Sequence, residues 1–191
     1  MRRKSLLLDQ ILVIDLEATC WDDNISFRPP GMENEIIEIG ISELNHQTGK
    51  IVQGDLFLVK PVRSEVSKFC TQLTTWTAAD LVDGCTFEAA CTRLCQQFSS
   101  RRRVFASWGN YDRNQFERQC RAFNVPYPFG PSHLNVKDLF SLQMGLTKTV
   151  NTMEAMKMLD IEPTGTWHIG RDDAFNIARV LSALLGHKEG E

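Results

Sequence analysis

The residues of this chain that are best suited to chemistry are acidic side chains at the ends of predicted elements. Asp15 and Glu17 end the apolar run that begins at Ile11. Because side chains alternate between the two faces of a strand, these carboxylates leave the same face and can converge on one point. They repel each other unless a proton or a cation lies between them, and hard oxygen ligands on a rigid element suit Mg²⁺ or Mn²⁺. An Asp-x-Glu pair also occurs by chance in many chains, so a metal site requires partners elsewhere in the sequence.

Further acidic residues and a histidine supply candidate partners for this pair. Asp112 follows a predicted strand and a glycine break, and Asp172 and Asp173 begin a predicted helix shortly after His168. Each aspartate alone is more typical of a helix cap or of a favourable charge at a helix N-terminus. The combination of an acidic pair, a third aspartate and a histidine followed by aspartates favours one shared acidic site.

The elements that must position these residues can be read from hydrophobic periodicity and turn chemistry. β-branched and alternating runs predict strands, and apolar residues at helical spacing predict helices. Strands are expected at the opening run and over 35–44, 50–59, 103–108 and 134–136. Helices are expected over 77–84, 86–98, 112–123, 137–144, 151–159 and 172–185.

The order of these elements predicts the fold class. The first three strands follow one another with no intervening helix, which indicates an antiparallel meander. The fourth strand lies between two helices, and helices dominate the second half of the chain. This order predicts an α/β fold with a mixed five-stranded sheet flanked by helices.

Length and composition set the limits of the interpretation. The chain has 191 residues, of which 42% are hydrophobic and 24% charged, and we expect residues 1–191 to form a single domain. The net charge of −3 does not indicate general nucleic-acid binding, which usually needs a basic surplus. Arginines do gather locally at 101–103 and at 113, 118 and 121. Such clusters contact phosphate in some proteins and are solvated surface in more of them.

Cysteine usage and hydropathy predict the compartment. The six cysteines form no C-x-x-C pair and no spacing typical of zinc, so we expect reduced, mostly buried thiols. No segment reaches the length of a transmembrane helix. We therefore expect a cytoplasmic protein with no membrane partner.

Five segments that together span most of the chain match a known signature. These segments are Asp15–Cys20, Glu35–Gly40, Phe69–Thr74, Ala106–Asp112 and His168–Arg179. On these motifs the chain resembles the DEDDh group of 3′-to-5′ exonucleases in the ribonuclease H-like superfamily, with particular likeness to the ERI/KapD-like branch. The resemblance implies a ribonuclease H-like fold for the mixed sheet.

The resemblance also implies roles for the acidic residues and the histidine. Carried over by position, Asp15, Glu17, Asp112 and Asp173 are the metal-binding carboxylates, and His168 is the general base. Two Mg²⁺ or Mn²⁺ ions in each active site would offset the repulsion among these carboxylates. Adjacent helical residues point in different directions, so Asp173 and its neighbour cannot both face the metals. We hypothesise that His168, in a loop with glycines close by, swings in when substrate binds.

A further set of residues is expected to contact the nucleotide at the 3′ end. The family resemblance implies that the backbone around Ala18 and Thr19 approaches the terminal ribose, and we expect Trp76 and Tyr111 to stack on bases. Trp21 and Phe69 are aromatic candidates for which base contact and plain packing both stay open. The segment Leu73–Trp76 departs from the branch, where Leu-Thr-Gly followed by an aliphatic residue is common.

The sequence thus predicts a metal-dependent exonuclease that hydrolyses single-stranded RNA or DNA, or overhangs, from the 3′ end and releases nucleoside 5′-monophosphates. Two alternatives belong to other classes. One is a catalytically idle regulator that holds nucleic acid or a protein partner, and the other is a proofreading subunit that acts beside a polymerase. No motif separates RNA from DNA or identifies a protein partner.

Overall fold

The structure is a computed structural model that describes residues 6–22 and 31–187. Its strands are β1 (Ile11–Ala18), β2 (Ile36–Leu44), β3 (Ile51–Leu58), β4 (Val104–Ser107) and β5 (His133–Asn135). Its helices are α1 (Lys68–Thr74), α2 (Phe87–Gln97), α3 (Tyr111–Phe123), α4 (Val136–Gln143), α5 (Thr152–Met158) and α6 (Gly170–Leu184).

The five strands form one mixed sheet in the order β3-β2-β1-β4-β5. β1 pairs with β2 and β2 with β3 in antiparallel fashion, whereas β4 pairs in parallel with both β1 and β5. The opening run is therefore the central strand, and its core residues Leu12, Val13 and Ile14 are fully buried. The predicted α/β class, the antiparallel meander and the mixed five-stranded sheet are confirmed.

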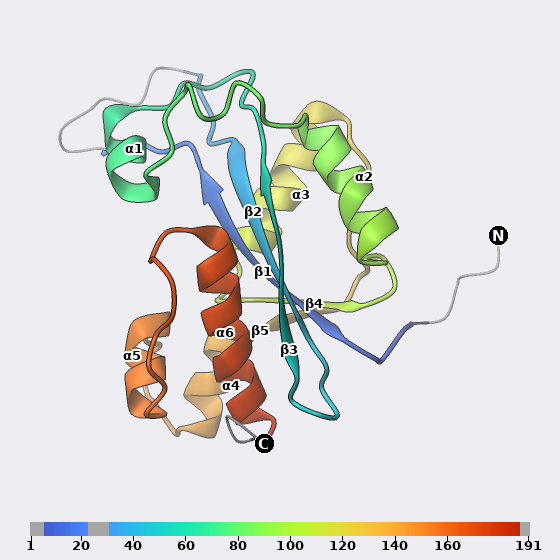
Figure 1. Ribbon diagram of the computed structural model, residues 1–191, viewed down its shortest axis with the longest axis vertical. Coiled ribbons are helices and arrows are strands. Elements are labelled where there is room, and N and C mark those ends of the chain that lie inside the picture. The colour runs from blue at the N-terminus through green and yellow to red at the C-terminus, as the bar shows by residue number, and fades with distance from the viewer. Residues whose placement is uncertain (1–5, 23–30, 188–191) are drawn as a thin grey trace.

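Helices cover both faces of the sheet (Figure 1). α2 and α3 lie on one face, where Phe87, Leu94 and Phe116 pack with residues of β1 and β2. α4, α5 and α6 lie on the other face, and α6 makes the largest contribution to that core, with Ile177 and Leu181 among its buried side chains. The N-terminal end of α6 reaches the same end of the sheet as the C-terminal end of β1 (Figure 1).

The helix predicted over 77–84 is wrong. This segment forms tight turns closed by hydrogen bonds from Val82 N to Ala79 O and from Gly84 N to Leu81 O. Leu81 is the only side chain of the segment that is fully buried, and so few tertiary contacts do not offset the cost of nucleating a helix. The helix of this region is α1, which lies a few residues earlier and which periodicity did not predict.

Other boundaries follow the sequence closely. The Asn151 and Glu154 signature forms a complete capping box at the start of α5. The six cysteines are free thiols. Within residues 6–22 and 31–187, no helix is long and apolar enough to cross a membrane.

Candidate active site

The end of β1 presents the acidic pair to the face of the sheet that α6 covers. In the β1–β2 ladder Asp15 lies opposite Gly40 and Glu17 opposite Glu38. Glu17 is 8% exposed. Cross-strand partners share a face of the sheet, so this short piece of ladder concentrates carboxylates at one place.

Asp112 reaches the pair from α3. It lies in the first turn of that helix, it is 4% exposed, and its Oδ1 accepts a hydrogen bond of 3.1 Å from the backbone N–H of Leu16. This bond attaches the start of α3 directly to the strand between Asp15 and Glu17. Asp112 is therefore fixed beside the pair by backbone geometry.

The start of α6 brings the remaining predicted residues to the same point. His168 Nδ1 lies 3.6 Å from Glu17 Oε1, and Asp173 Oδ2 accepts a hydrogen bond of 2.8 Å from the His168 backbone N–H. His168 has a φ of 63°, a left-handed conformation that is uncommon outside glycine and that histidine, asparagine and aspartate adopt more often than other residues. Ligand atoms of Glu17, His168 and Asp173 all lie within 4.8 Å of one another.

These residues open into a pocket of about 520 Å³, a size suited to one small ligand. Its walls hold all five predicted catalytic and metal residues together with aromatic and polar side chains. The lining residues are Asp15, Leu16, Glu17, Trp108, Tyr111, Asp112, Asn151, Thr152, Met153, Trp167, His168 and Asp173.

Burial and mutual repulsion shift the acidity of this cluster. Burial, followed by the charges of Asp112 and Asp173, raises the pKa of Asp15 well above its usual value. Burial and the neighbouring Glu38 raise the pKa of Glu17 to about 9. Burial also raises the pKa of Asp112 to about 6 and that of Asp173 to about 6. The protein alone therefore does not balance the charge that these carboxylates carry when ionised.

The donor set fits divalent cations. Asp173 Oδ1 is buried and has no hydrogen-bond partner among the described residues, which is costly for a carboxylate oxygen unless a cation or a proton satisfies it. Clustered carboxylate oxygens are hard ligands, which suit Mg²⁺ and Mn²⁺. The group of Glu17, His168 and Asp173 therefore has ligand atoms that could hold a divalent cation.

The raised pKa values lead to a test of pH-dependent stability. In the presence of a chelator, the free energy of unfolding is expected to fall as the pH rises from 5 to 9. The reason is that the pKa values of Glu17, Asp112 and Asp173 in the folded protein exceed those of the unfolded chain, which are about 4. The folded state then binds more protons than the unfolded state, so stability present at low pH is lost through this window. Melting curves in EDTA and in Mn²⁺ measure the effect, and Mn²⁺ should stabilise the protein more at pH 8 than at pH 5.

Glu17→Gln is the informative variant for this test. Removing one ionisable group should raise the stability of the metal-free protein at pH 8 by about 1–3 kcal/mol, or about 3–10 °C in melting temperature for a chain of this size. The same variant should lose most of the stabilisation by Mn²⁺. A metal-free wild-type protein that became more stable from pH 5 to pH 8 would contradict this account of the cluster.

Asp172 has a different role from its neighbour. Its Oδ1 accepts a hydrogen bond of 2.9 Å from the Gln53 side chain on β3, and its Oδ2 accepts one of 2.9 Å from the backbone N–H of Thr166. Through these two oxygens, Asp172 links the loop before His168 to β3. Both oxygens of Asp172 thus have partners, in contrast to Asp173 Oδ1, which has none among the described residues.

The residues predicted to contact the nucleotide differ in their exposure and in their position relative to the pocket. Tyr111 lines the pocket and is 53% exposed, which leaves its ring available for stacking. Ala18 is 6% exposed, and Thr19 is fully buried with its hydroxyl bonded to Ser64 Oγ and to the Glu35 backbone N–H. The Thr19 side chain therefore braces the end of β1, and only backbone in this segment could approach a ribose.

Trp76 lies beside the pocket instead of lining it. It is partly buried against Cys70 and Leu81, and its indole N–H donates to a carboxylate oxygen of Glu38. Phe69 and Trp21 are also partly buried.

Three large apolar residues that line the pocket were not predicted from the sequence. They are Trp108, Trp167 and Met153, and Met153 is 52% exposed. Trp167 directly precedes His168, and Trp108 lies four residues before Asp112. These positions near predicted site residues could have identified both tryptophans as candidate pocket residues. Met153 carried no such signal, because its place depends on how α5 packs against α6.

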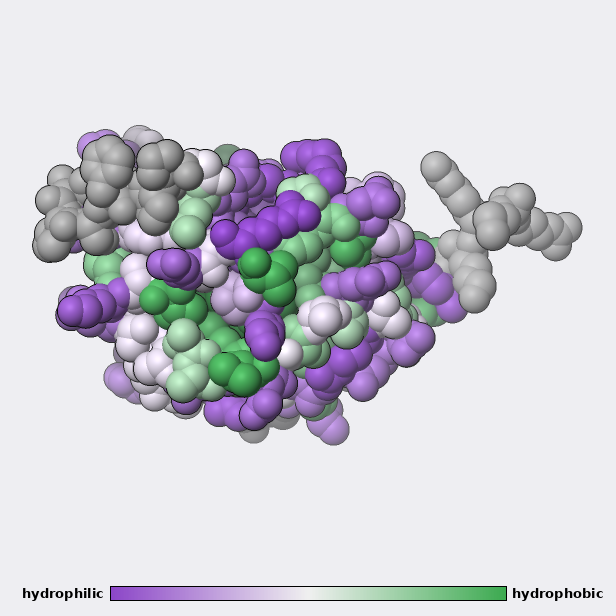
Figure 2. All heavy atoms as spheres, turned by 90° about the horizontal axis from the view of Figure 1, so that it is seen from above, coloured by the Kyte–Doolittle hydropathy of each residue, from purple (hydrophilic) through white to green (hydrophobic). Residues whose placement is uncertain are grey.

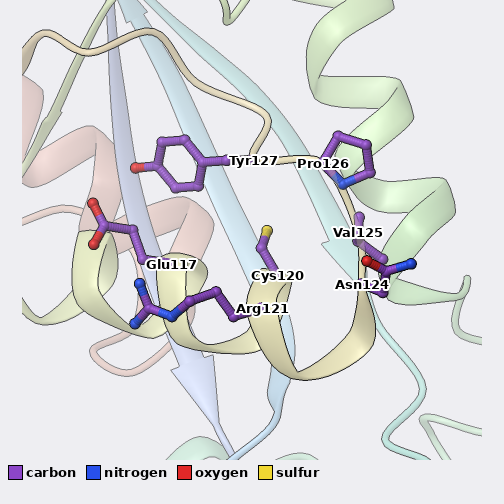
Figure 3. Close-up of a pocket in the computed structure, with 7 residues that line it drawn as sticks. All are labelled: Glu117, Cys120, Arg121, Asn124, Val125, Pro126 and Tyr127. Atoms are coloured by element: carbon purple, nitrogen blue, oxygen red, sulfur yellow. The ribbon is translucent and has the colours of Figure 1, made fainter.

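Other pockets lie away from the acidic cluster. A second pocket of about 520 Å³ is formed by the end of α3 and the loop that follows it (Figure 3). Tyr127 lies above Glu117 and Arg121 in that pocket, and no predicted site residue lines it.

The surface gives little general attraction for nucleic acid. The face seen in Figure 2 mixes hydrophobic and hydrophilic side chains, and the net charge is −3. A phosphate backbone is therefore not drawn in by the field of the whole protein. Any affinity for nucleic acid would have to come from local contacts.

Comparison with known proteins agrees with this geometry. The model of the Exonuclease family (RNase_T) matches residues 12–181. Human ERI1 exoribonuclease 3 is 29% identical over 184 residues, which cover 91% of this chain and 52% of that protein. Human 3′-5′ exoribonuclease 1 is 27% identical over 190 residues, which cover 93% of this chain and 52% of that protein. The chain thus spans about half the length of these curated relatives.

A solved structure has the same fold as this chain and a sequence identity to it similar to that of these relatives. The nuclease domain of 3′hExo, a DEDDh family member bound to rAMP, superposes with a TM-score of 0.80 at 26% identity, over 93% of this chain and 92% of that domain. Fold and site together define a DEDDh-type nuclease of the ribonuclease H-like superfamily, as the sequence motifs predicted. The chain belongs to the Exonuclease family, and its likeness to the ERI-like members is confirmed. This family implies dependence on divalent metal.

Proposed function

We propose that this chain is a 3′-to-5′ exonuclease that removes nucleotides one at a time from single-stranded 3′ ends and releases nucleoside 5′-monophosphates. The observation that carries the proposal is the convergence of Glu17, His168 and Asp173 within 4.8 Å, in a pocket that Asp15 and Asp112 also line. A regulator with an idle site would not need these ligand atoms together.

Asp15, Glu17, Asp112 and Asp173 would hold two divalent cations, Mg²⁺ or Mn²⁺. When bound, such ions lower the pKa of a coordinated water and offset the charge of a phosphate undergoing displacement. The carboxylates lie on β1, at the start of α3 and at the start of α6. Because these elements are tied together by backbone contacts, they hold the ligands in a fixed arrangement before substrate arrives.

His168 is the residue proposed to accept the proton of the attacking water. The unprotonated nitrogen of a neutral imidazole can accept a proton from water. Its side chain is 52% exposed and lies beside Glu17 at the pocket, so solvent and substrate both reach the ring. The hydrogen bond from its backbone N–H to Asp173 fixes the residue while leaving the ring nitrogens unused by that contact.

RNA is the proposed substrate in preference to DNA. The curated relatives are named as exoribonucleases, and the nuclease domain of similar fold is bound to rAMP. The Tyr111 ring offers a stacking surface that tolerates any base, so little preference among sequences is expected.

A degradation assay tests this function. Matched single-stranded RNA, single-stranded DNA and overhang duplexes, labelled either at the 5′ end or in the 3′-terminal nucleotide, are incubated with Mn²⁺, with Mg²⁺ and with EDTA. We expect a ladder of products shortened from the 3′ end, mononucleotide release that EDTA abolishes, and faster loss of RNA than of DNA. A circular RNA of the same sequence is the control and should remain intact. No release in Mn²⁺ from any substrate would refute the proposal, and faster loss of DNA would refute the preference for RNA.

A further inference from the structure

Glu38 is an additional buried carboxylate beside the active site. It lies on β2 directly opposite Glu17 in the antiparallel ladder, and it is 0% exposed. It is not one of the proposed metal ligands. Like charges that face each other across a ladder destabilise the pair, so a buried glutamate at this position requires an explanation in its contacts.

The contacts of Glu38 join two segments that are far apart in the chain. Its Oε2 accepts a hydrogen bond from the indole N–H of Trp76, just beyond α1. Its Oε1 is buried, has no hydrogen-bond partner among the described residues and lies against the start of α6, where a Cβ added at Gly170 would be 3.1 Å away. One side chain therefore lies between the segment after α1 and the helix that carries Asp173.

Trp76 is held in place on other sides as well. Its ring packs against the cluster of Ile37, Cys70 and Leu81, and its carbonyl oxygen accepts a hydrogen bond of 2.9 Å from Thr71 Oγ1. The residue stays partly exposed. A partly exposed aromatic ring with a fixed orientation, one side chain away from Glu17, is well placed to contact a base at the edge of the site.

We propose that Glu38 is a positioning residue that holds the Trp76 ring where it contacts the base of the terminal nucleotide. This inference rests on the proposed exonuclease function. Because the same carboxylate also contacts the start of α6, the base contact and the catalytic groups keep one relative position. Loss of the Glu38–Trp76 hydrogen bond should therefore weaken recognition of the base while leaving the phosphate end of the site intact.

Binding of AMP and of ribose 5-phosphate to the full chain in Mn²⁺ tests the proposal, because the second ligand lacks the base. The wild-type protein should bind AMP about tenfold more tightly than ribose 5-phosphate. Trp76→Phe keeps a ring and removes the donor, and Glu38→Met keeps the length of the side chain and removes the acceptor. Each variant should reduce the ratio to about twofold, with ribose 5-phosphate affinity unchanged within about twofold.

The double variant and a matched aromatic variant sharpen the test. Glu38→Met combined with Trp76→Phe should lose no more than the stronger single variant, because both remove one interaction. Tyr127→Phe also keeps a ring and removes a polar hydrogen, in the pocket at the end of α3 away from the acidic cluster, and should keep the tenfold ratio. In turnover on RNA, the Glu38 and Trp76 variants should raise KM about tenfold and leave kcat within about threefold.

Two results would overturn the proposal. One is an unchanged ratio in Trp76→Phe, which remains informative even if Glu38→Met fails to fold. The other is an equal loss of AMP and ribose 5-phosphate binding, since Glu38 would then support binding of the sugar phosphate that both ligands share. A wild-type protein that discriminates between the two ligands and yet releases no nucleotide from RNA would refute the exonuclease function and leave this inference standing.

Discussion

Replacing Asp173 with asparagine is expected to abolish nucleotide release, whereas the same change at Asp172 should leave most of it. Asp173 Oδ1 is buried and has no hydrogen-bond partner among residues 6–22 and 31–187, as expected of an oxygen that binds a cation. An amide in its place is a poorer ligand for a hard cation. We expect kcat/KM to fall by about a thousandfold, because several kcal/mol of transition-state stabilisation are lost and about 1.4 kcal/mol corresponds to a factor of ten.

The neighbouring aspartate is the matched control. The oxygens of Asp172 accept hydrogen bonds from Gln53 and Thr166, and an asparagine oxygen can still accept one of them. Asp172→Asn should therefore reduce kcat/KM by less than about tenfold. Asp15→Asn, Glu17→Gln and Asp112→Asn should behave like Asp173→Asn. Initial rates on labelled RNA in Mn²⁺ compare the variants, and an inactive Asp172→Asn beside an active Asp173→Asn would exchange the two roles.

Local patterns were sufficient to predict the elements that carry these residues. The run from Ile11 to Ile14 is apolar and β-branched, and it became the buried central strand. Asn151 and Glu154 predicted a capping box that the structure contains. In both cases the signal lies within a few neighbouring residues, so no knowledge of the tertiary structure was needed.

Features that depend on distant contacts were not predicted. α1 begins at a Ser67 cap, but its seven residues are too few to show helical periodicity. The contact between Trp76 and Glu38 joins residues 38 positions apart, and Met153 reaches the pocket only through the packing of α5. The sequence suggested Trp76 as a base contact, yet the residue that orients its ring could be identified only from the fold.

Gly40→Ala is expected to be the most destabilising single-methyl change in the site. Gly40 lies opposite Asp15 in the ladder, and a Cβ added there would lie 1.9 Å from the backbone carbon of Gly170. Backbone cannot rotate away as a side chain can, so the start of α6 would have to move off the sheet. We expect a loss of at least about 3 kcal/mol in the free energy of unfolding.

The same displacement should reduce activity, because α6 carries Asp173 and follows His168 directly. A shift of about 1 Å in catalytic groups can cost about a hundredfold in rate, so folded Gly40→Ala protein should lose activity at temperatures well below its melting point. Gly145→Ala is the control, since Gly145 has a φ of 65° with nothing within 4 Å of an added Cβ. It should cost only about 1–2 kcal/mol of backbone strain and keep the wild-type rate. Denaturant unfolding with initial rates on RNA measures both quantities, and a Gly40→Ala protein of wild-type stability would show that α6 does not require this close approach to place the catalytic residues.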